Sequence, residues 1–145
     1  MALQKSTLAL LTLANQADLG ALEAALAEWG VPAYRLDGRD IRDTATFWRA
    51  AGQQLPLPPG RREPASWSAL SDSLWESLHE VESEELALLW TDAQAMLDGG
   101  LADLLAAVDV LTRLSRQFYS PSSPQATPKT LYVILAGMGP NFPRI

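Results

Sequence analysis

Short apolar runs alternate with helical patterns along most of this chain. Residues 7–13 form a continuous apolar run of strand length, and residues 15–29 carry leucines at spacings of three and four. The first pattern suits a strand covered on both faces, whereas the second is typical of an amphipathic helix. The segment "VPAYRL" then completes a strand–helix–strand pattern. This alternation predicts an α/β fold with a mostly parallel sheet of about four strands.

The same alternation continues toward the C-terminus. The turn "DG" is followed by Ile41, which we expect to point inward, and Asp43 or Thr44 can cap a helix to about Gln54. "LPLPPGRREP" and "YSPSSPQATPK" are expected to be loops, because proline removes a donor and fixes φ. The remaining predicted elements are a helix over 66–80, a strand over 85–90, a short helix capped by Thr91 or Asp92, a longer helix over about 101–118 and a final strand, "TLYVIL".

The longer predicted helix has a stripe of apolar residues on one side. We expect that stripe to be buried against the sheet. Its members are Leu101, Leu104, Leu105, Val108, Leu111 and Leu114.

Charge is strongly segregated along the chain. Residues 63–112 contain eleven acids and neither Lys nor Arg, so the rest of this chain of net charge −6 carries an excess of five bases. A strongly negative surface favours a basic protein partner and fast, salt-sensitive association, although acids that only aid solubility would give the same pattern. Direct binding of nucleic acid is disfavoured because phosphate needs a concentrated basic patch.

The composition excludes most enzyme classes. The chain has no Cys and a single His79, so it lacks a thiolate nucleophile, a disulfide framework and a histidine-rich metal site. No glycine pattern resembles a phosphate-binding loop. Two exposed carboxylates one turn apart would lack the pocket that separates the pKa values of an acid and a base. We therefore expect no catalytic residues, no metal site, no cofactor and no enzyme activity.

No apolar stretch approaches the roughly 18 residues that span a bilayer. Lys5 followed by "STLALLTLA" has the outline of a short signal peptide, but the run favours a buried strand. We therefore expect a cytoplasmic protein that does not associate with membranes.

The segment "SWSALSDSLWESLHE", residues 66–80, is predicted to form one helix with an acidic outer face. Two residues along a helix rotate by about 200°, so Asp72 and Glu76 lie nearly opposite Leu70 and Leu74. Two like charges at this spacing lower the stability of an isolated helix by roughly a few tenths of a kcal/mol. Two interpretations are open: the acidic face is only solvated, or it binds a basic partner. The residues predicted to form the buried stripe are Trp67, Leu70, Leu74, Leu78 and Val81. Those on the outward line are Ser68, Asp72, Glu76 and Glu80. Trp75 lies at the border between the two.

Several segments together resemble the barstar family, intracellular inhibitors of secreted bacterial ribonucleases. "AYRLDGRDIRDTATFWRAAGQQL" is similar to that family's first strand, turn and first helix. "SDSLWESL" resembles its inhibitory helix, with Asp72 and Glu76 at the positions of two outward acids and Trp75 between them. Leu86, Leu88 and Trp90 match the family's second strand, and "TLYVIL" resembles its last.

The resemblance implies a barstar-like sandwich of three to four strands packed with helices. We expect a single domain over 1–145, with a strand–helix extension in 1–30, a barstar-like core in 31–136 and a tail in 137–145. The implied function is inhibition of a basic ribonuclease or a related toxin, in the manner of an antitoxin, by a chain that is a monomer when free. The alternative is an acidic module that binds another basic partner without inhibiting a ribonuclease. The implied partner-binding residues are Trp67, Ser68, Asp72, Trp75, Glu76 and Glu80.

This chain departs from the family pattern in several places. The aromatic-glycine segment before the inhibitory helix is replaced by "REPASW", and the N-terminal extension and the Ser/Pro loop are extra. A second register is also open, in which "SWSALSDSL" places Ser68 at the first acid position and makes Asp72 the second acid. Asp72 is a binding residue in both registers.

Overall fold

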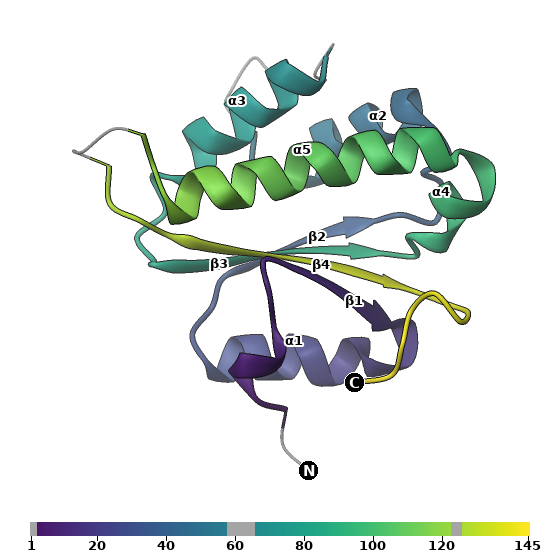
Figure 1. Ribbon diagram of the computed structural model, residues 1–145, viewed down its shortest axis with the longest axis horizontal. Helices are drawn as coiled ribbons and strands as arrows, with labels where there is room; N and C mark the ends of the chain where they lie inside the picture. Colours follow the sequence, from purple (N-terminus) through teal and green to yellow (C-terminus); the bar gives the residue numbers. More distant parts are fainter. Residues whose placement is uncertain (1–2, 58–65, 123–125) are drawn as a thin grey trace.

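Four parallel strands form one sheet in the computed structural model, which describes residues 3–57, 66–122 and 126–145 (Figure 1). The sheet order is β1-β4-β3-β2. This confirms the predicted α/β class and the parallel sheet. The strands are β1 (Leu11–Asn15), β2 (Ala33–Asp37), β3 (Glu85–Thr91) and β4 (Thr130–Gly137).

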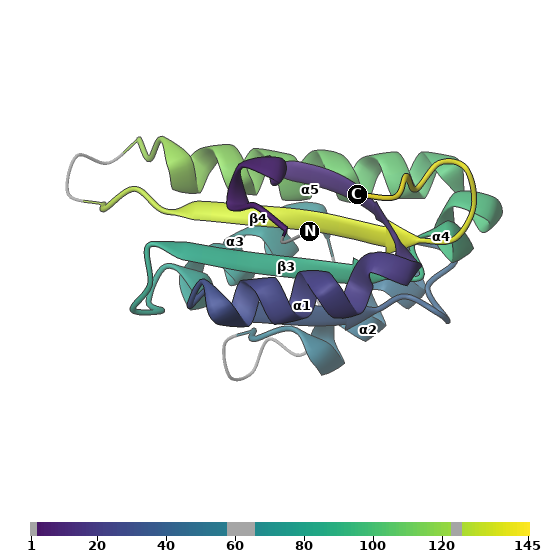
Figure 2. The ribbon, with the colours of Figure 1, turned by 90° about the horizontal axis from the view of Figure 1, so that it is seen from below.

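Helices cover both faces of this sheet. Four of them, α2 to α5, lie on one face or at its end, and α1 lies alone on the other (Figures 1 and 2). An all-parallel sheet needs this two-sided cover, because its central strands are apolar on both faces. The helices are α1 (Leu19–Glu28), α2 (Thr44–Gln54), α3 (Trp67–Leu78), α4 (Gln94–Gly99) and α5 (Leu101–Tyr119).

The central strand β3 divides its side chains between two cores. Leu86, Leu88 and Trp90 pack in the larger core with α2, α3 and α5, whereas Ala87 and Leu89 pack in the smaller core against α1. This division follows from the two-residue period of a strand. A continuous apolar run is therefore required at 86–90, and "LALLW" supplies it.

The N-terminal strand–helix unit is present, but its strand begins later than predicted. A 3-10 helix occupies Lys5–Thr7, and pairing of Leu11 with Val133 of β4 sets the start of β1. The prediction that both faces of this strand are covered is wrong, because β1 lies at the sheet edge and only Ala14 of its five residues is buried. Leu8 enters the smaller core ahead of the strand.

The C-terminal tail returns to this N-terminal unit. The Asn15 amide donates to the Pro143 carbonyl at 3.0 Å, and the Arg144 guanidinium donates to both carboxylate oxygens of Asp18 at 2.9 and 3.0 Å. The hydrogen bond from Arg144 lowers the pKa of Asp18. The tail therefore covers part of an otherwise open strand edge, a common protection against edge-to-edge association.

The predicted turn and cap before α2 are confirmed, with Asp43 as the cap. Its carboxylate accepts from the Thr46 amide at 2.9 Å, and Thr46 Oγ1 accepts from the Asp43 amide at 3.1 Å. These reciprocal bonds satisfy two amides at the start of the helix, and the Thr46 amide lowers the pKa of Asp43. Ile41 is 1% exposed, as its predicted inward position requires.

Two details near the C-terminal helices correct the predictions. Neither Thr91 nor Asp92 caps α4, since Thr91 belongs to β3, Asp92 has a φ of 52° and Ala93 occupies the cap position. Leu101 and Leu105 do not join the buried stripe of α5 and are 54% and 59% exposed. The small side chains of Ala107 and Ser115 face the core and let the helix approach the sheet. The buried residues of α5 are Leu104, Ala107, Leu111, Leu114, Ser115 and Phe118.

Parts of both predicted loops, residues 58–65 and 123–125, lie outside the described residues. Within the described ranges, no helix combines the length and apolarity needed to cross a bilayer.

Candidate functional site

Helix α3 is held at its N-terminus and along its inner face. The Ser66 hydroxyl accepts a hydrogen bond from the Ala69 amide at 3.1 Å and so caps the helix. Leu70, Leu74 and Leu78 are fully buried in the larger core. The helix is therefore fixed against the sheet by the stripe that the spacing predicted, and its opposite face is turned to solvent.

The predicted acids lie on that outer face. Asp72 and Glu76 are both exposed and one helical turn apart. Within the described part of the chain, no hydrogen bond or ion pair engages the Asp72 carboxylate. Ser68, also exposed, lies one turn before Asp72. The geometry thus leaves Asp72 available to a partner; its role in binding stays a prediction.

A shallow groove of about 340 Å³ runs beside Asp72, between α3 and α5. Ser68 and Trp67 line it from α3, and Asp109 and Arg113 line it from α5. The Arg113 Nε atom lies 3.1 Å from a carboxylate oxygen of Asp109. This arginine is therefore engaged by an acid of its own helix.

The two tryptophans of α3 are half-buried and bridge core and surface. Trp67 packs 5.4 Å from Phe47 and 5.6 Å from Trp48 between ring centroids. Trp75 stacks on Phe118 of α5 at 4.5 Å. Both rings help to fix α3 on its neighbours, and their exposed edges border the acidic face, where an aromatic ring can serve as an anchor.

Glu80 does not continue the acidic line on the helix. The helix ends at Leu78 with His79 as its cap, two residues earlier than predicted, so Glu80 lies in the turn that follows. The His79 Nδ1 atom lies 3.0 Å from the Trp75 carbonyl and 3.1 Å from that of Glu76, which makes it a donor to the helix end. That role closes the last turn and explains the early stop.

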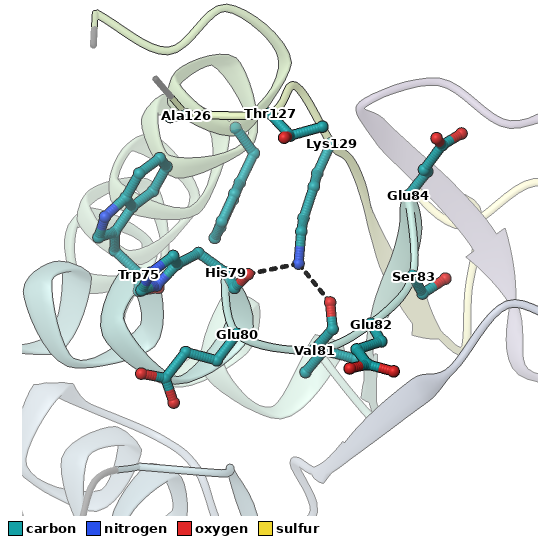
Figure 3. Close-up of a pocket in the computed structure, with 11 residues that line it drawn as sticks. Trp75, His79, Glu80, Val81, Glu82, Ser83, Glu84, Ala126, Thr127 and Lys129 are labelled. Atoms are coloured by element: carbon teal, nitrogen blue, oxygen red, sulfur yellow. Dashed lines mark hydrogen bonds between the residues drawn. The ribbon is translucent and has the colours of Figure 1, made fainter. Parts of the chain in front are cut away.

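Lys129 also binds the end of α3, a contact that sequence reasoning missed. Its ammonium donates to the carbonyl of Leu78 at 3.1 Å. It also donates to the carbonyls of His79, at 2.7 Å, and Val81 (Figure 3). Burial lowers the pKa of Lys129, while the three carbonyls favour the charged form. Lys129 is 50 residues from His79 along the chain, so no local pattern could have revealed the pair.

Acidic and histidine side chains can also cluster to hold a metal ion. Among the described residues, no group of three or more His, Asp or Glu side chains could hold a metal ion. The single histidine is turned to the backbone. Helix α3 presents an acidic outer face on a support of buried leucines, and charge of this kind can be complemented by a basic protein surface.

A family model for barstar, the barnase inhibitor, matches residues 31–136. The chain belongs to the barstar family. The match begins just before β2 and runs through α2, α3, β3 and α5 into β4, so α3 lies inside it and β1 and α1 precede it. A comparison with curated proteins gave no match. Membership of the barstar family supports a protein-binding role of the inhibitor kind.

Proposed function

We propose that this chain inhibits a basic ribonuclease by laying α3 across the active-site cleft of that enzyme. The observation that carries the proposal is the exposed Asp72 carboxylate, which no described residue engages, on a helix fixed by three fully buried leucines. The family match over the same helix supports an inhibitory role.

The proposed mechanism is occlusion by charge mimicry. A ribonuclease binds substrate phosphates with cationic side chains, and a carboxylate presents the same charge to those groups. Asp72 and Glu76 lie on one helix face at a spacing of about 5–6 Å between their Cβ atoms. Both would enter the cleft together, while Trp67, Ser68 and Trp75 contact its rim. The helix backbone then excludes substrate.

Rigidity makes this arrangement effective. The Asp72 carboxylate, which no described residue engages, would gain cationic partners in the cleft. Because α3 is already ordered by its Ser66 cap and its buried stripe, little conformational entropy is lost on binding.

The test is inhibition of purified basic ribonucleases by the wild-type chain and by Asp72→Ala. We expect inhibition at equimolar dose, weakened more than tenfold by the substitution, which is about 1.4 kcal/mol. Asp98→Ala is the matched control, since Asp98 is exposed on α4 and has no partner among the described side chains. The association rate should fall as salt rises. Equal potency of both variants would exclude α3 as the site, and binding without inhibition would favour an adaptor.

A second pair of variants separates the two registers. If Asp72 and Glu76 form the acidic pair, Glu76→Gln weakens inhibition and Ser68→Ala does not. If Ser68 and Asp72 occupy the two positions, Ser68→Asp tightens inhibition. Circular dichroism and urea unfolding show whether each variant keeps its fold.

A further inference from the structure

A pocket of about 600 Å³ lies beyond the C-terminal end of α3 (Figure 3). Its apolar lining comes from three elements: Trp75 of α3, Val81 of the following turn and Phe118 of α5. Thr127 and Lys129, which precede β4, close another side. Because these residues are separated in sequence, only the fold creates the pocket.

Three acids border one side of the apolar lining. Glu80, Glu82 and Glu84 line the pocket and are exposed, and Figure 3 shows them along the turn that joins α3 to β3. In the described chain, none of these carboxylates has a hydrogen bond or an ion pair. Lys129, the one cation among the lining residues, is already bound to the carbonyls of Leu78, His79 and Val81.

Other charged groups near the pocket are also engaged. His79 is turned to the helix backbone, and Glu85, which follows Glu84, pairs with Lys5 at 2.7 Å. The pocket therefore presents an apolar surface bordered on one side by three carboxylates, which outnumber the single positive charge of Lys129. A metal ion would leave the apolar surface unused, and a nucleic acid phosphate would be repelled.

We propose that this pocket receives a basic segment of the protein partner, with one large apolar side chain flanked by Arg or Lys. The apolar side chain would cover the half-exposed Trp75 and Val81 above the buried Phe118, and the cations would pair with Glu80, Glu82 and Glu84. Long cationic side chains suit such a site, because their methylene stems cover apolar surface while their charged ends reach carboxylates. An apolar anchor inside a polar rim is the usual form of a binding hot spot.

This inference rests on the proposed function, because the pocket adjoins the helix end that would enter the ribonuclease. It adds a second contact with a different requirement. The acidic face of α3 needs cations alone, whereas the pocket needs an apolar side chain between them.

The test uses a peptide probe, acetyl-Arg-Leu-Arg-amide, titrated into the ¹⁵N-labelled full chain and followed by NMR. We expect saturable shifts centred on Val81, Ser83 and Thr127, and at least fivefold weaker binding by acetyl-Arg-Gly-Arg-amide. The triple variant E80Q/E82Q/E84Q should lose the shifts. The matched control E23Q/E28Q/D98N makes the same change in charge at exposed sites elsewhere and should bind within twofold of wild type.

Each outcome decides the proposal. Shifts scattered over all acidic surfaces, equal binding of both peptides, or unchanged binding by the triple variant would overturn it. The peptide assay measures binding at the pocket without any ribonuclease. The inhibition assay with Asp72→Ala tests the proposed function. Failure of one is therefore distinguishable from failure of the other.

Discussion

The ammonium of Lys129 lies 2.7 Å from the carbonyl oxygen of His79, the residue that caps the C-terminal end of α3. Carbonyls at a helix end carry partial negative charge and lack partners within the helix. A cation from the segment before β4 therefore stabilises the end of the acidic helix. It also fixes the wall of the pocket that follows.

Replacing this cation should loosen the end of α3. We expect Lys129→Met to lower the free energy of unfolding by about 1–2 kcal/mol, because three carbonyls lose a charged donor. Urea unfolding followed by circular dichroism measures the effect. Arg49→Met, which removes an exposed cation from the middle of α2 that makes no hydrogen bond or ion pair in the described chain, is the matched control. Equal stability of the two variants would contradict the capping role.

The turn after β2 should not tolerate a side chain at Gly38. A Cβ atom there would lie 2.3 Å from the Thr91 carbonyl oxygen, which already accepts the Gly38 amide at 2.9 Å. We expect Gly38→Ala to destabilise the fold by about 1–3 kcal/mol through overpacking. Gly20→Ala on the exposed side of α1, where the added atom has open space, should instead stabilise by up to about 1 kcal/mol. A neutral Gly38→Ala in thermal unfolding would show that the turn can shift.

A three-residue cluster should make stability depend on pH at both extremes. Hydrogen bonds from Lys5 and Tyr132 lower the pKa of Glu85 below its ordinary 4.5, and burial together with Glu85 raises the pKa of Tyr132 to about 12. The contribution of Glu85 is present above its ordinary pKa and is lost as pH falls through the lowered value. That of Tyr132 is present below its ordinary 10.0 and is lost as pH rises toward about 12.

Two substitutions check these signs. Glu85→Gln should flatten the loss of stability in urea unfolding below about pH 4.5. Tyr132→Phe should remove the phenol that ionises near 12 from an ultraviolet titration of the three tyrosines. If the wild-type titration shows no phenol near 12, the cluster does not form in solution.

The N-terminal unit should be part of the folding core. Leu26 of α1 is 1% exposed and packs against the face of the sheet opposite α3. We expect Leu26→Ala to cost about 2–5 kcal/mol, whereas Leu13→Ala at the exposed edge of β1 should cost much less. Inhibition by the Leu26 variant should persist while it remains folded, because the change lies across the sheet from α3. Equal losses of stability would mean that α1 is only loosely attached.

Local patterns predicted most elements of the fold. The continuous apolar run "TLYVIL" predicted β4, because a strand covered on both faces needs apolar residues throughout. "ELALLW" predicted β3 only from its context, since its Leu and Ala content also suits a helix. The stripe at Leu70, Leu74 and Leu78 gave the orientation of α3, and hence the outward position of Asp72. The prediction of which residues are buried was less accurate where a helix has two possible apolar stripes. On α5 the sequence favours Leu105 as readily as Leu104, and only packing against the sheet buried one and exposed the other.

The sequence by itself determined the acidic outer face of α3, because burial of its leucines leaves the opposite positions to solvent by helical geometry. It also determined the alternation of strands and helices. Only the tertiary structure decided that Lys129 binds the end of α3, and that Trp75, Val81 and Phe118 line one pocket beside three acids. These contacts join residues far apart in the chain, and their positions depend on strand order and helix packing, which no local period encodes.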